Sequence, residues 1–137
     1  MHRATILVVE DNETQRRVIS QLCESFDFDV HMVSSGEEAL DACACTTYAA
    51  ILLDLGLPGI NGYECAKRLR ELERKFKIRT PIIAVTSDRD ARTACIKVGM
   101  DDYISKPFDH EAFRILLLRW AYQADKPNLK LLKSTKS

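Results

Sequence analysis

AAILLDLGLPGING, residues 49–62, decides the fold class of this chain. An unbroken apolar run fills its first five positions and stops at the acidic residue Asp54. Turn-forming residues punctuate the segment that follows, namely Pro58, Gly59, Asn61 and Gly62. Residues 63–76 then carry apolar side chains at helical spacing. A short, continuous apolar run is typical of a strand that is buried on both faces, so the stretch predicts a parallel strand, a loop and a covering helix.

The same alternation of strand and helix recurs on both sides of this stretch. Further strands are predicted at residues 5–9, 29–33, 82–85 and 103–105, and further helices at residues 13–26, 35–43, 89–98 and 109–122. Ser35 and Glu38 match a capping box at one helix start, and Gly99 suits a helix end. Five strands that each precede a helix predict an α/β fold, a flavodoxin-like (βα)5 three-layer sandwich with a five-stranded parallel sheet of order 2-1-3-4-5.

Length and composition indicate one globular domain. The chain has 137 residues, of which 46% are hydrophobic and 29% charged. We assign residues 1–123 to the domain. Residues 124–137 carry four lysines and one aspartate, and we expect a basic tail that is frayed or a linker, with membrane or nucleic-acid contact as the alternatives.

Charge and cysteine content exclude several classes of function. Basic and acidic residues balance at 20 each, which argues against direct binding of nucleic acid. No apolar run reaches the roughly 20 residues of a membrane span and no signal peptide precedes the first strand, so we expect no direct membrane contact and a cytoplasmic location. The five cysteines are scattered, and Cys43 and Cys45 lack the neighbouring ligands of a zinc site. We therefore expect reduced thiols.

Acidic side chains stand where the first and third predicted strands end. Glu10 and Asp11 follow the first strand, and Asp54 follows the third. In a sheet of the predicted order these ends are neighbours about 5 Å apart. Like charges at that distance oppose one another unless a cation joins them, and magnesium prefers such oxygen ligands. Thr86 adds a hydroxyl after the fourth strand, and we expect Lys106 to place a positive charge on the far side of the pocket.

Four segments of the chain resemble those of response-regulator receiver domains: ILVVEDN (6–12), ILLDLGLPGINGYE (51–64), PIIAVTS (81–87) and GMDDYISKPF (99–108). The resemblance covers residues 4–122 and implies that Asp54 accepts a phosphoryl group from a histidine. It implies that Asp11, Asp54 and the backbone carbonyl of Gly56 bind Mg²⁺ directly, while Glu10 acts through water. The acidic pair is Glu-Asp here instead of the family's Asp-Asp.

The resemblance also assigns residues to a switch. Lys106 matches the family's invariant lysine, and its bond to the following proline matches a cis peptide. Thr86 matches the switch hydroxyl and Tyr103 the aromatic switch position. Ser87 and Asp88, together with the missing side chain at position 56, are expected to tune the lifetime of the acyl phosphate.

The switch is expected to act on one surface, formed by residues 89–98, 103–105 and 109–122. This surface is expected to include Arg92, Cys95, Ile96, Tyr103 and residues near Phe113, and it is a candidate for homodimer formation. Phe113, Leu116 and Leu117 are expected to pack in the core. Leu118 and Trp120 are expected at the edge, where they would contact another domain or a second copy.

The function implied is that of a phosphorelay component that catalyses only its own phosphorylation and dephosphorylation. The expected partner is a histidine kinase or a histidine phosphotransfer domain that docks near Gln15, Val18 and Ile19. Residues 10–12 (EDN), 99–108 (GMDDYISKPF) and 117–120 (LLRW) resemble receivers of hybrid histidine kinases, in which case a parent kinase would tether the domain to the inner membrane. A free-standing regulator is the alternative.

Two other classes of protein fit the residues less well. A magnesium phosphatase of the haloacid-dehalogenase type needs a second acid two residues after its aspartate nucleophile, where this chain has Gly56. A pseudo-receiver that acts only as a binding module usually lacks the acceptor, the acidic pair or the lysine. Here Asp54, Glu10, Asp11 and Lys106 are all present.

Overall fold

The computed structural model describes residues 3–122. Its strands are β1 (Thr5–Val9), β2 (Asp29–Val33), β3 (Ala50–Asp54), β4 (Ile82–Thr86) and β5 (Asp102–Ser105). Its helices are α1 (Glu13–Ser25), α2 (Gly36–Cys45), α3 (Gly62–Phe76), α4 (Arg92–Lys97) and α5 (His110–Leu117), and α5 continues into a π-helical turn, η1 (Leu118–Tyr122). The strands form one parallel sheet of order β2-β1-β3-β4-β5, which confirms the predicted fold.

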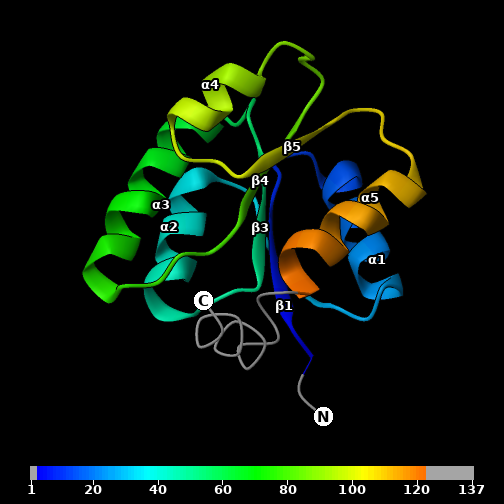
Figure 1. Ribbon diagram of the computed structural model, residues 1–137, viewed down its shortest axis with the longest axis horizontal. Coiled ribbons are helices and arrows are strands. Elements are labelled where there is room, and N and C mark those ends of the chain that lie inside the picture. Colours follow the sequence, from blue (N-terminus) through cyan, green and yellow to red (C-terminus); the bar gives the residue numbers. More distant parts are fainter. Residues whose placement is uncertain (1–2, 123–137) are drawn as a thin grey trace, which may run out of the picture.

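Helices cover both faces of this sheet. α2, α3 and α4 lie on one face, and α1 and α5 lie on the other (Figure 1). Successive strand residues point to opposite faces, so Leu53 packs in the core under α2 and α3 while Leu52 packs in the core under α1 and α5. Every residue of β3 and β4 is buried, as their continuous apolar runs predict.

Side chains next to the first turns fix several helix starts. Asn61 accepts a hydrogen bond from a backbone amide at the start of α3, and Asp109 does so at the start of α5. Ser35 accepts from the Glu38 amide at 3.1 Å, as the capping box predicts. The Glu38 carboxylate, however, accepts from the hydroxyls of Ser34 and Ser35 instead of from a backbone amide of Ser35. Only half of the predicted box therefore forms.

Two predicted helices differ most from their counterparts in the structure. The helix predicted at 89–98 is shorter and begins at Arg92, because the Asp88 carboxylate accepts from the Asp90 amide at 2.9 Å and holds the chain in a bend before it. It ends at Lys97, one residue before the predicted end, and Gly99 follows with a φ of +93°. The helix predicted at 109–122 is regular only as far as Leu117.

The core of the last helix is predicted correctly, and its edge only in part. Phe113, Leu116 and Leu117 are buried. Leu118 is exposed, but Trp120 is half-buried and its indole Nε1 donates to Asp102 Oδ2 at 2.9 Å. The last described turn is thereby joined to β5.

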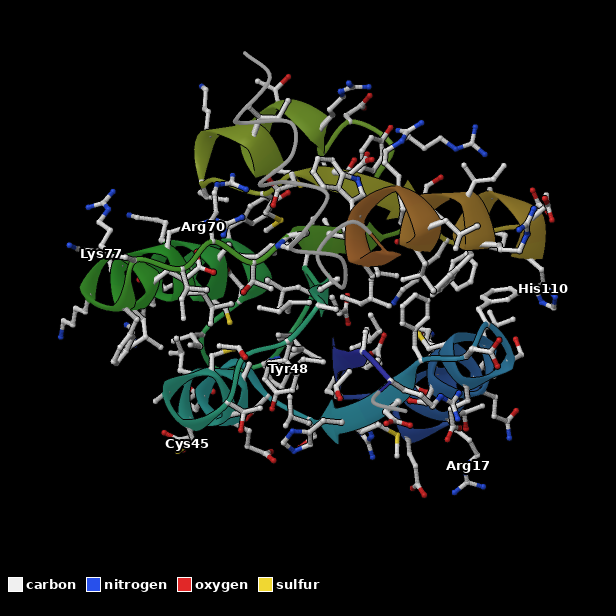
Figure 2. All side chains as sticks on the ribbon, turned by 60° about the horizontal axis from the view of Figure 1, so that its bottom comes forward. Arg17, Cys45, Tyr48, Arg70, Lys77 and His110 are labelled. Carbon is white, nitrogen blue, oxygen red and sulfur yellow. The ribbon has the colours of Figure 1, made fainter. Side chains whose placement is uncertain are left out.

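All five cysteines lie within the residues that the structure describes. All five thiols are free, and Cys45 lies exposed at the end of α2 (Figure 2). Burial raises the pKa of the Cys23 thiol to about 12. None of the helices within residues 3–122 combines the length and the apolar character that a membrane crossing needs. The predicted basic tail, 124–137, lies outside the described residues.

Candidate functional site

Three acidic side chains meet at the carboxyl ends of β1 and β3. Asp54 is the last residue of β3, and Glu10 and Asp11 directly follow the neighbouring strand. One carboxylate oxygen of each residue lies within 4.8 Å of the other two. At the start of α3 a Cβ on Gly62 would stand 2.6 Å from the backbone oxygen of Asp54, so only glycine allows the helix to begin this close. The structure therefore brings the predicted acids together.

Glu10 is the most deeply buried of the three acids. Its side chain is 2% exposed and accepts hydrogen bonds from the Asn12 amide at 3.1 Å and from Lys106 Nζ at 3.0 Å. Burial raises the pKa of Glu10, and the neighbouring Asp54 raises this pKa further, while the two hydrogen-bond donors lower it. A cation at this site would favour the ionised form of Glu10.

Lys106 lies closer to the acids than predicted. Its ammonium Nζ is 3.0 Å from Glu10 Oε1, 2.7 Å from Gln15 Oε1 and 3.6 Å from Asp54 Oδ1. The prediction that it stands on the far side of the pocket is therefore wrong, because its long side chain reaches back from the end of β5 to the end of β1. The peptide bond between Lys106 and Pro107 is cis, as predicted.

The hydroxyl and glycine predicted for the site border the acids as well. Thr86 ends β4 and is buried, and its Oγ1 accepts from the Asp88 amide at 3.0 Å. The Gly56 amide donates to Asp54 Oδ1 at 3.1 Å, which orients the carboxylate. Ser87 and Asp88 are exposed at the rim. Each residue thus lies at the same edge of the sheet.

A groove of about 560 Å³ lies beside the acids, between the start of α1 and the segment after β5. Gln15, Val18, Ser87, Phe108 and His110 are among its lining residues. Figure 2 shows His110 at the start of α5. The sequence indicated the α1 residues of this groove, but no sequence pattern indicated that Phe108 and His110 line its opposite side.

Two further contacts of the site were not predicted. Gln15 was expected only at a docking surface, and its contact with Lys106 depends on a side-chain direction that hydrophobic periodicity does not give. Arg16 donates to the backbone oxygen of Glu10 at 2.8 Å and so links α1 to the segment that carries the acidic pair. Ile19, expected beside Gln15 at that surface, is buried although it borders the groove.

The surface predicted to switch is present only in part. Arg92 and Ile96 are exposed on α4, and Ile96 keeps 60% of its surface accessible. Tyr103 is half-buried and packs against the core under α2 and α3. Cys95 is buried in that core, so its assignment to the surface is wrong.

Comparison with known proteins identifies similar chains. Residues 6–117 match the family described as response regulator receiver domain. Hybrid signal transduction histidine kinase L of Dictyostelium discoideum is 31% identical over 121 residues, which are 84% of this chain and 7% of that protein. Response regulator ArlR of Staphylococcus saprophyticus is 40% identical over 108 residues, which are 77% of this chain and 47% of that protein. The chain thus spans less than half the length of these relatives.

A solved structure has the same fold. The receiver domain of a sensor histidine kinase of Pseudomonas aeruginosa PAO1 is 34% identical, with a TM-score of 0.79 over 88% of this chain and 98% of that one. That structure contains a magnesium ion coordinated in its active-site cleft.

Proposed function

Because this chain belongs to the response regulator receiver domain family, we propose that it takes a phosphoryl group from a phosphohistidine onto the carboxylate of Asp54. The observation that carries the proposal is the meeting of three acids and the Lys106 ammonium at one edge of the sheet. The chain acts as a component of a two-component phosphorelay, and its catalysis is confined to gaining and losing its own phosphoryl group.

The acidic cluster fits a magnesium ion. Carboxylate oxygens within 4.8 Å of one another are the hard ligands that Mg²⁺ prefers, and the similar P. aeruginosa receiver domain has magnesium in its active-site cleft. Asp11 and Asp54 would hold the ion with the backbone carbonyl of Gly56, and Glu10 would act through water. When bound, magnesium neutralises charge on the transferring phosphoryl oxygens.

The side chains divide the chemistry between them. A carboxylate oxygen of Asp54 attacks phosphorus, the bond from phosphorus to the imidazole nitrogen breaks, and the imidazole leaves with the electron pair. The Gly56 amide orients this carboxylate by donating a hydrogen bond to Oδ1. Lys106 donates to a phosphoryl oxygen as charge develops there. The product is an acyl phosphate, which water hydrolyses.

Phosphorylation would then be read through Thr86 and Tyr103. The Thr86 hydroxyl turns toward a phosphoryl oxygen, and Tyr103 moves into the space that it leaves. The surface of α4, β5 and α5 changes in consequence and is the candidate homodimer face. At the rim, Ser87 leaves the phosphoryl group open to a partner and Asp88 adds negative charge, so both tune its lifetime.

The groove beside the acids is the docking site that we propose for the phosphohistidine partner. A histidine kinase or a histidine phosphotransfer domain would contact Gln15 and Val18 and approach Asp54 past Ser87. Similarity to a hybrid histidine kinase supports such a parent protein. Residues 1–123 would then be its receiver domain in the cytoplasm, and the parent kinase would be tethered to the inner membrane. Direct contact with nucleic acid or membrane has no part in this function.

Intact-mass spectrometry after incubation with acetyl phosphate tests the proposal. With Mg²⁺ the protein should gain the mass of one phosphoryl group, and chelation of the metal should prevent the gain. Asp54→Asn should gain nothing, whereas Asp41→Asn, which changes an exposed acid on α2, should behave as the unmodified chain. The proposal fails if the adduct persists in Asp54→Asn, or if neither acetyl phosphate nor a phosphorylated phosphotransfer domain modifies the protein.

A further inference from the structure

The shortest contact of the Lys106 ammonium is with a neutral side chain. Gln15 Oε1 accepts from Nζ at 2.7 Å, which is shorter than the 3.0 Å bond to Glu10. Gln15 lies in the first turn of α1, and the Asn12 side chain accepts from its backbone amide at 2.9 Å. The helix cap therefore fixes the backbone from which the Gln15 side chain reaches the lysine.

Two acceptors hold the ammonium beside Asp54 without letting it close on the carboxylate. An ammonium has three N–H donors, and Glu10 and Gln15 each take one. Asp54 Oδ1, at 3.6 Å, is beyond ordinary hydrogen-bond distance. Glu10 and Gln15 thus leave one donor of the ammonium for another acceptor, and Asp54 Oδ1 lies within 3.6 Å of Nζ.

We propose that Gln15 is a positioning residue for Lys106, whose amide oxygen keeps the ammonium off the Asp54 nucleophile and its third donor free for an incoming phosphoryl oxygen. The inference rests on the proposed function and assigns one residue a part in it. Without this acceptor, attraction between opposite charges draws Lys106 onto Asp54. The attacking oxygen is then covered, and the lysine no longer meets the phosphoryl group from the side.

An amide suits this task better than other side chains of similar size. Methionine has nearly the same length but is only a weak acceptor, so it cannot hold an ammonium. Glutamate would hold the ammonium but would add a fourth carboxylate to three that already crowd one another. Glutamine supplies an acceptor without charge. Its side chain is exposed in the groove, so replacing it leaves the core intact.

The test compares Gln15→Met with Gln21→Met. Gln21 is an exposed glutamine of the same helix that borders a different depression, with Arg17 and Met32. The rate of phosphorylation by acetyl phosphate at saturating Mg²⁺ should fall about fivefold to tenfold in Gln15→Met, since a hydrogen bond to a charged group is lost. In Gln21→Met it should stay within about twofold of the original, because no contact of Lys106 changes.

A second readout needs neither metal nor turnover. Exchange of the Lys106 ammonium protons with water, followed by NMR in the metal-free protein, should quicken severalfold in Gln15→Met. It should stay slow in Gln15→Glu, which keeps an acceptor, and in Gln21→Met. The positioning role is overturned if Gln15→Met leaves either the exchange or the phosphorylation rate unchanged. If the unmodified chain takes no phosphoryl group at all, the proposed function fails, and the exchange still decides whether Gln15 holds the lysine.

Discussion

Lys106 and Glu10 are 96 residues apart in the chain, yet Nζ of one lies 3.0 Å from Oε1 of the other. Their strands, β5 and β1, are not neighbours, because β3 and β4 lie between them. Glu10 is 2% exposed, so the cost of burying its charge is offset by this one ammonium and by a backbone amide. The contact places the Lys106 ammonium beside the carboxylates of Glu10 and Asp54. The first prediction depends on the charges gathered there.

Magnesium should stabilise the protein through Asp11. The three crowded carboxylates and the raised pKa of Glu10 mean that the ionised cluster opposes folding near neutral pH when no cation is present. At a magnesium concentration ten times its Kd, linkage gives about 1.4 kcal/mol of added stability, or about 4 to 6 °C in Tm. Asp11→Asn should melt no lower than the original without metal and should lose most of the increase. Thermal denaturation with and without Mg²⁺ measures both effects.

Asp41→Asn is the control for this prediction, since it removes an exposed acid outside the cluster. It should keep the full magnesium effect. An equal rise in Tm for the original protein and for Asp11→Asn would mean that magnesium acts elsewhere.

Thr86→Ala should separate phosphoryl binding from the switch. Thr86 is buried at the end of β4 and its hydroxyl accepts from the Asp88 amide, so alanine removes the group that would turn toward the phosphoryl oxygen. We expect Thr86→Ala to bind beryllofluoride with Mg²⁺ still, within about tenfold of the original affinity. The amide resonances of Tyr103 and Ile96 should move in the original protein and should stay in place in Thr86→Ala.

The measurement is a pair of amide NMR spectra before and after beryllofluoride. Thr93→Ala, an exposed change on α4, should show the same displacement as the original chain. Displacement of Tyr103 in Thr86→Ala would disprove the coupling between the two residues.

Arg70 should matter more to stability than any charge near the acids. Its guanidinium, 13% exposed, donates to the backbone oxygens of Gly99 and Thr80 at 2.8 Å and pairs with Asp101 at 2.7 Å and Glu73 at 2.6 Å. It lies on the α3 side of the molecule, among elements that it ties together (Figure 2). Arg70→Met leaves two largely buried carboxylates without this partner, and we expect a loss of about 3 to 5 kcal/mol.

Urea denaturation of Arg70→Met against Arg68→Met measures this contribution. Arg68 pairs with Glu64 on the exposed face of the same helix, and its loss should cost about 0.5 kcal/mol or less. Similar midpoints for the two variants would show that the Arg70 network adds nothing beyond an ordinary surface pair.

The sequence predicts the meeting of Glu10, Asp11 and Asp54 because it depends on two simple rules. The runs of apolar residues locate the strand ends, and parallel topology puts those ends at one edge of the sheet. The position of Lys106 follows from neither rule, since a four-carbon side chain can point either way from the same backbone. Its contact with Gln15 is missed for the same reason.

The errors at helix ends have a local cause. Residues 89–98 carry a weak helical period, but the Asp88 carboxylate accepts from the Asp90 amide at 2.9 Å and holds the chain in a bend before α4. Cys95 was assigned to the surface by the family resemblance, which does not give the buried face of this helix, and six residues are too few for periodicity to give it. Hydrophobic spacing likewise cannot separate an α-helix from the π-helical turn after Leu117.

The hydrogen bond from Trp120 to Asp102 has a mechanical consequence. Asp102 directly precedes Tyr103 in β5, while Trp120 lies in the last turn that the structure describes. If phosphorylation displaces Tyr103 as we propose, Asp102 would pass the movement to the end of α5 through its contacts with Trp120 and Arg119. In the proposed switch, the turn that follows α5 would thus respond to the aspartyl phosphate through β5, without itself touching the phosphoryl group.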